Sequence, residues 1–170
     1  QGAGQQGIGF FARGQRLPVP LFPGFDTLGT LAHLRATGFD HSWFILTQKI
    51  IKKEFALSGS EQNPDLTGRS WRMVAGRALG KRATGPVEAF KKRGEDFVVA
   101  DDLKDLVAGM NKLTPQPLLN CDQIEREVKA RDSQLDNPFC KDAQLAMIRN
   151  ARNYFGDKLI RTASPHKFLD

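Results

Sequence analysis

The sequence predicts an α+β fold, in which an N-terminal hairpin and a central strand form a small sheet that several helices cover. Two observations lead to this prediction. The unbroken apolar and β-branched run 43–47 is typical of a strand buried on both faces. Elsewhere, apolar residues recur at helical spacing behind residues that cap helices well. A chain of 170 residues is long enough for one domain with its own core.

The first elements are expected to be strands. Residues 8–11 and 16–21 flank a short turn in which Gly14 is free to take a positive φ, so we expect a hairpin. Pro18 and Pro20 lack the N–H that a central strand donates, which restricts the second arm to an edge strand or an extended segment.

A helix and the central strand come next. Asp26 is placed to cap a helix over 27–37, which Gly38 ends and whose apolar stripe consists of Leu28, Leu31 and Leu34. The strand 43–47 then runs directly into an amphipathic helix that ends near Phe55. We expect this strand to be the most buried one of the fold.

The middle of the chain alternates between polar and helical segments. Residues 58–67 are typical of a surface loop, and a helix is expected over 68–79. A short helix should follow with Pro86 in its first turn, and 97–99 should form a short strand or an extended link.

Three helices are expected in the last third. Asp101 is placed to cap a helix over 102–110, and Asn120 begins a capping-box pattern ahead of 124–134. Asn137 is expected to cap the last helix, which starts with a proline and has apolar residues at steps of four: Phe139, Ala143, Met147, Ala151 and Phe155.

The net charge of +6 is concentrated in the segment 67–93, which holds eight Lys or Arg residues and one acidic residue, Glu88. Such a segment is either the solvated face of helices or a surface for an anionic partner such as nucleic acid. Nucleic-acid readers usually place aromatic side chains among the charges, and here Phe90 stands alone while Trp71 falls on an apolar helix side. Nucleic acid is therefore the less favoured partner.

The composition and the two cysteines also indicate in which cellular compartment the protein works. No apolar run reaches the length of about 20 residues that spans a bilayer, and no signal-peptide pattern opens the chain. Cys121 and Cys140 lie far apart without metal-type spacing, which favours free thiols in a reducing compartment. These features predict a cytoplasmic protein with no membrane association and no metal site.

Residues 2–7 match G-x-G-x-x-G, the dinucleotide-binding fingerprint. The fingerprint needs a strand before it and a helix after it, but in this sequence only Gln1 stands before Gly2, and a predicted strand follows Gly7. We therefore expect residues 1–7 to be a flexible arm, and we expect no cofactor-binding residue in this chain.

Several motifs, in this order, resemble the capping domain of FAD-dependent oxidoreductases of the succinate dehydrogenase/fumarate reductase flavoprotein type, above all the 3-oxosteroid 1-dehydrogenase-like members. The segment 14–17 is similar to the family's G-x-R-F hairpin, and 44–51 is similar to its strand-helix with the pattern apolar-apolar-D-Q. The segments 102–107 and 124–128 stand where the family has two characteristic helices.

The resemblance implies a capping-type domain over 8–170, excised from a larger flavoprotein and inactive by itself. In the parent, FAD would be bound by the missing flavin-binding domain, and the substrate would be a small molecule with a CH–CH bond or a ketone. Two alternatives remain: a basic helical module that binds an anionic partner, and a helical interaction domain without chemistry.

The resemblance also implies which residues face the substrate, although it identifies no catalytic residue. The family's catalytic tyrosine follows the hairpin, and the corresponding aromatic residue here is Phe25, which has no hydroxyl. The acid of the family's hairpin is missing as well. The candidates near this hairpin and the following helix are Arg16, Phe25, Thr27, Thr30 and His33.

Overall fold

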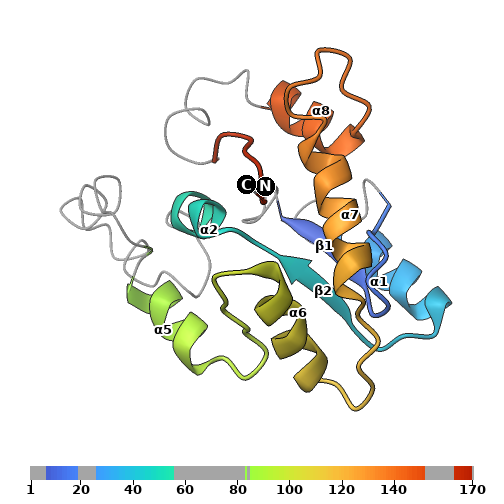
Figure 1. Cartoon of the computed structure of the whole chain (residues 1–170), viewed down its shortest axis with the longest axis vertical. Helices are drawn as coiled ribbons and strands as arrows, with labels where there is room; N and C mark the ends of the chain where they lie inside the picture. The colour runs from blue at the N-terminus through green and yellow to red at the C-terminus, as the bar shows by residue number, and fades with distance from the viewer. Residues whose placement is uncertain (1–6, 19–25, 56–82, 84, 152–162, 170) are drawn as a thin grey trace.

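The computed structural model describes residues 7–18, 26–55, 83, 85–151 and 163–169. The loop and helix predicted over 58–79 lie outside the described residues, as do the end of the hairpin arm, Phe25 and the last residues of the final predicted helix. The order of elements is β1 (Ile8–Phe11), α1 (Thr27–Thr37), β2 (Ser42–Ile45), α2 (Gln48–Glu54), α5 (Gly85–Arg93), α6 (Leu103–Lys112), α7 (Cys121–Asp132) and α8 (Ala143–Ala151) (Figure 1). This arrangement confirms the α+β class.

The sheet consists of β1 and β2, which pair antiparallel with Ile8 opposite Ile45. The predicted hairpin is confirmed in its turn, where Gly14 has a φ of 84°. In the described part its second arm is an extended segment, one of the two predicted forms, which returns beside β1 at the single bridge between Phe10 and Arg16. The proline at position 18 has no N–H to continue this pairing.

The most buried strand is β1, and the prediction that 43–47 holds this place is wrong. The side chains of Ile8 and Phe10 are 0% exposed, whereas in β2 only Ile45 is buried. The reason is the order of the chain segments. Because β1 lies between β2 and the returning segment around Arg16, it is the middle of this small layer, and β2 is an edge.

Helix α1 has the predicted bounds and caps. The side chain of Asp26 accepts a hydrogen bond from Gly29 N at 2.7 Å, and Gly38 ends the helix in the left-handed conformation. The predicted apolar stripe is wrong, because Leu28 and Leu31 are 79% and 53% exposed. The helix packs instead through the side that carries Thr30 and His33.

The later helices differ from prediction mainly at their starts. Asp102 caps α6, one residue after the predicted cap, and Asn120 caps α7 as expected. The start predicted for the last helix is wrong: the Asn137 side chain accepts from Phe139 N and forms a local turn, and α8 begins only at Ala143. The short helix α5, with proline in its first turn, and the extended link that follows it are confirmed.

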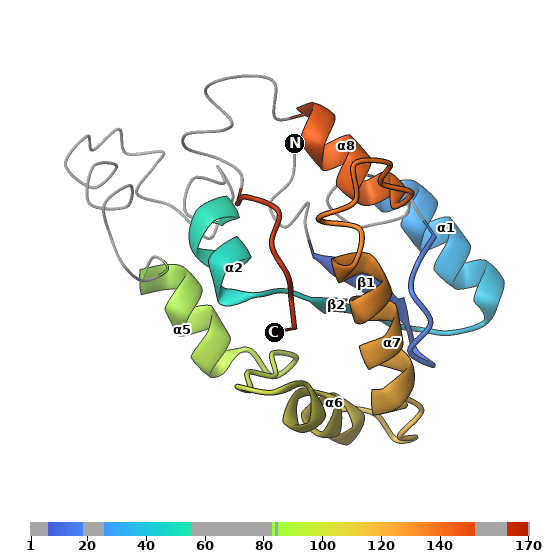
Figure 2. The same cartoon turned by 45° about the horizontal axis from the view of Figure 1, so that its top comes forward.

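The core lies between the sheet and two helices. Apolar side chains of α6 and α7 pack against β1 and β2, and the members of this cluster are Ile8, Phe10, Ile45, Val107, Met110, Leu119, Ile124 and Val128. Figure 2 shows β2 running from α1 toward α2, with α5 and α6 beyond its free edge. None of the helices in the described part of the chain combines the length and the apolar character needed to cross a lipid bilayer.

Candidate functional site

A cleft of about 920 Å³ runs along β2 and is bounded by α2, α5, α6 and the extended link 94–102. The cleft lies between β2 and the link 94–102. In the described sheet β2 pairs only with β1, so the edge of β2 that faces the link has no strand partner. Its apolar lining includes Trp43, Phe44, Phe55, Phe97, Val98 and Met110. Such a size and lining are typical of sites for small organic ligands.

A histidine–carboxylate pair lies where β2 begins. Asp40 and His41 both line the cleft, and His41 Nδ1 lies 2.6 Å from Asp40 Oδ1. The His41 ring also makes an edge contact with Trp43, with ring centroids 5.4 Å apart. The hydrogen bond from His41 holds the pKa of Asp40 below its ordinary value, so this carboxylate is ionised and accepts the bond.

At the other end of β2, a lysine is neutralised by its neighbours. Lys91 Nζ donates to Gln48 Oε1 at 2.7 Å and to Glu88 Oε2 at 3.3 Å, and Gln48 Nε2 donates to Glu88. Burial acts to raise the pKa of Glu88, but the hydrogen bonds from Gln48 and Lys91 outweigh it and lower that pKa. The ionised Glu88 therefore balances the one lysine that lines the cleft.

Arg16, predicted to face the substrate, forms a bridge between distant parts of the chain. Its Nη1 donates to Asp142 Oδ2 at 2.5 Å, and its Nη2 donates to Gln144 Oε1 at 2.8 Å. Gln144 in turn donates to Gly7 O at 2.8 Å. The guanidinium thus ties the hairpin turn to the start of α8, and its role toward a substrate stays a prediction.

The other predicted site residues lie on α1, apart from the cleft. Thr27 is exposed at the start of the helix, whereas Thr30 is buried and its hydroxyl donates to Asp26 O at 2.6 Å. The His33 ring packs on Phe11, with ring centroids 5.3 Å apart. None of these residues lines the cleft. Their substrate-facing role is untested and stays a prediction, as does that of Phe25.

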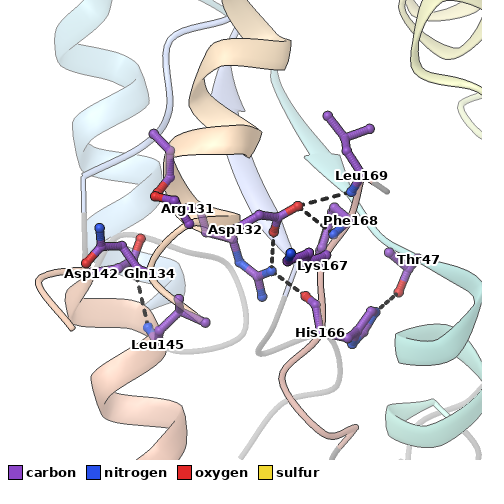
Figure 3. Close-up of polar contacts among 12 residues, drawn as sticks. Thr47, Arg131, Asp132, Gln134, Asp142, Leu145, His166, Lys167, Phe168 and Leu169 are labelled. Atoms are coloured by element: carbon purple, nitrogen blue, oxygen red, sulfur yellow. Dashed lines mark hydrogen bonds and ion pairs between the residues drawn. The ribbon is translucent and has the colours of Figure 1, made fainter. Parts of the chain in front are cut away.

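The segment 163–169 is held against α7 and α2 by polar contacts (Figure 3). Arg131 Nη1 donates to Asp132 Oδ1 and to His166 O, and Asp132 Oδ2 accepts from the N–H groups of Phe168 and Leu169. His166 Nε2 lies 2.7 Å from Thr47 Oγ1, at the cap of α2. This cluster was not predicted from the sequence, because nothing in the local pattern marks Arg131 as buried.

Asp142 is expected to make stability sensitive to acid. Burial acts to raise its pKa, but hydrogen bonds from Arg16 and from Leu145 N outweigh burial and lower it below 3.8. The resulting stabilisation is present above the unfolded pKa and is lost as the pH falls through the folded pKa. Asp142→Asn should therefore lower the free energy of unfolding by about 2 kcal/mol at neutral pH and weaken its fall below about pH 4.

Urea unfolding of both proteins at several pH values measures this difference. Asp122→Asn, on the exposed side of α7, is the matched control. An unchanged acid profile in Asp142→Asn would show that the ion pair with Arg16 contributes nothing to it.

Two predictions concern metal and nucleotide binding, and of the fingerprint 2–7 only Gly7 lies among the described residues. These residues contain no group of three or more His, Cys, Asp or Glu side chains that could hold a metal ion. Gly7 is followed by the predicted strand, now β1, and not by a helix whose N-terminus would receive a pyrophosphate.

These features describe a small α+β fold with an apolar cleft that has polar side chains at its two ends. Over 94% of its own length, the chain is 53% identical to a KsdD-like steroid dehydrogenase of Mycolicibacterium smegmatis. It is 52% and 51% identical to two KsdD-like steroid dehydrogenases from different strains of Mycobacterium tuberculosis, again over 94% of its length. The relatives confirm the resemblance to 3-oxosteroid 1-dehydrogenase-like proteins.

The chain spans 28–29% of the length of these curated relatives. No protein-family model matches the chain, and no solved structure is detectably similar to it.

Proposed function

We propose that residues 8–170 form the substrate-capping domain of a larger FAD-dependent dehydrogenase that acts on a ketone-containing, steroid-like molecule. The observation that carries this proposal is the identity of 51–53% over 94% of the chain with proteins named steroid dehydrogenases. Identity at this level along almost the whole chain supports a shared role for the matching segment. The relatives do not favour the alternative of a basic module that binds nucleic acid.

The cleft supports an apolar substrate. Its aromatic and aliphatic walls would remove a steroid-like body from water, and each square ångström of apolar surface buried contributes about 25 cal/mol. At its two ends it is lined by the polar side chains of His41, bound to Asp40, and Lys91, bound to Gln48 and Glu88. We therefore place the substrate body along β2, in preference to the face near Arg16, whose guanidinium is already bound by Asp142 and Gln144.

In this proposal FAD is bound by the flavin-binding domain of the same parent chain and supplies the oxidising chemistry. The residues of this chain bind and orient the substrate and exclude water from it. Without its parent, the isolated chain should bind no flavin and catalyse no dehydrogenation.

The test uses the full-length parent and a ketosteroid, with an artificial electron acceptor to report turnover. The parent should contain flavin in equimolar amount and dehydrogenate the steroid. A charge placed in the cleft should weaken substrate binding, because an apolar substrate offers it no partner. Leu113→Glu, in the cleft lining, should raise KM about tenfold, with little effect on the folded state because Leu113 is exposed.

Leu28→Glu is the matched control, since Leu28 is also exposed but lies on α1 outside the cleft. A flavin-free parent without turnover would refute the proposed function. Equal KM values for the two variants would instead leave the activity standing and move the substrate away from the cleft.

A further inference from the structure

We propose that Asp40 and His41 form the polar recognition point of the cleft, where His41 Nε2 accepts a hydrogen bond from a hydroxyl group of a neutral, otherwise apolar ligand. This inference rests on the proposed function, because that proposal places the ligand body in the cleft. It adds the class of group that the cleft recognises and the atom that recognises it.

The role of acceptor follows from the partner of the other ring nitrogen. The ionised Asp40 carboxylate can only accept hydrogen bonds, so His41 Nδ1 carries the hydrogen of their 2.6 Å contact. In a neutral imidazole the second nitrogen is then an acceptor. No described residue donates to Nε2. The ring itself lines the cleft, so a ligand there has access to it.

The charges around the cleft favour a neutral ligand. The carboxylates that line it belong to Asp40, Asp96 and Asp101, and its one lysine, Lys91, is balanced by Glu88. On the hairpin turn, the Arg13 guanidinium lies over the Phe39 ring. An anionic ligand would meet repulsion from these carboxylates, and the one lysine among the described residues that line the cleft is already paired with Glu88.

The size of the cleft and the place of the pair also agree with this ligand. A volume of about 920 Å³ lies within the range of small-molecule sites. His41 directly precedes β2, so it stands at the end of the apolar wall formed by that strand. An elongated apolar molecule with a terminal hydroxyl would lie along β2 and meet His41 at this end.

The experiment compares androsterone with its methyl ether, which keeps the ring system but cannot donate from that oxygen. Calorimetric titration of the full-length parent should give an affinity about fivefold higher for the alcohol. His41→Phe keeps an aromatic ring against Trp43 but removes the acceptor, and it should bring the affinity ratio close to one. Leu31→Phe, which alters an exposed side chain on α1 outside the cleft, should retain the fivefold ratio.

Asp40→Ala tests the same affinity ratio in a second way. It should leave the fold intact, since the Asp40 side chain is 94% exposed. Without its carboxylate the His41 ring can adopt the other tautomer, so the preference for the alcohol should fall.

A preference that survives in His41→Phe, or that is absent in the unaltered parent, would overturn the inference. Failure of both steroids to bind would overturn it too. Flavin content and turnover of the same preparation test the proposed function separately, so the two failures are distinguishable.

Discussion

Asp132→Ala is expected to lower the free energy of unfolding by about 3–5 kcal/mol, because it leaves the charge of Arg131 buried without its partner. The Arg131 side chain is 1% exposed, and its Nη1 lies 2.7 Å from Asp132 Oδ1. The same substitution removes the acceptor of the backbone N–H groups of Phe168 and Leu169. Both losses act on one cooperative unit, so the segment 163–169 should loosen as well.

Asp136→Ala is the matched control, because this aspartate follows α7 closely but its side chain is 86% exposed. It should change the free energy of unfolding by less than about 0.5 kcal/mol. Urea unfolding measures both variants, and hydrogen exchange at Phe168 and Leu169 reports the loosening. Similar losses in the two variants would mean that Arg131 keeps enough other partners to stay buried.

The large expected effect does not make the ion pair a large source of stability. Burial lowers the pKa of Arg131, while the hydrogen bond and charge of Asp132 act in the opposite direction. Two further buried donors of this side chain, Nε and Nη2, have no acceptor among the described residues. Each such orphan costs about 1–3 kcal/mol. Removing one partner is costly although the intact cluster contributes little net stability.

A compensating contact is the ring of Phe168, whose centroid lies 4.6 Å from the Arg131 guanidinium carbon. Cation–π contacts of this kind contribute about 2 kcal/mol when they are removed from water. The cluster therefore works mainly to fix where the segment 163–169 lies, beside Thr47 and the start of α2.

Local signals in the sequence were enough to predict most helix ends. Asp26 and Asn120 cap helices through hydrogen bonds to residues three positions on, and Gly38 ends α1 by its own conformational freedom. Asn137 shows the limit of this reasoning. Its side chain can close either a helix start or a local turn, and the pattern of neighbouring residues does not decide between them.

Strand pairing and burial depend on contacts between residues that are distant in the sequence. The pairing of β1 with β2 joins segments about 35 residues apart, and nothing in either strand specifies it over the predicted hairpin. Burial of β1 depends on this pairing, which is why the prediction favoured the longer apolar run 43–47. The exposed side of α1 has the same origin, since a two-stranded sheet covers only part of the helix surface.

The cleft was not predicted from the sequence, and the predicted site residues stay predictions. The hairpin resemblance singled out Arg16, whose partner Asp142 is 126 residues away and invisible to any local pattern. The cleft combines β2 with the link 94–102, and only the folded chain brings them together. The one local signal for its polar end was a histidine beside an aspartate just before a strand, a signal too common to identify a site.

Phe10→Ala should be the most damaging single truncation in the sheet, with a loss of about 3–5 kcal/mol. Phe10 is fully buried and packs in the core cluster with residues of α6 and α7, so its removal leaves a cavity that the neighbouring strand and helices cannot close. In a thermal melt this loss corresponds to a fall in Tm of about 10 °C.

Phe139→Ala is the matched control, because the phenylalanine at position 139 is 83% exposed and its truncation should shift Tm by less than about 2 °C. If the two substitutions lowered Tm equally, β1 would not be the centre of the core. The prediction from the sequence, that 43–47 is the most buried strand, would then stand.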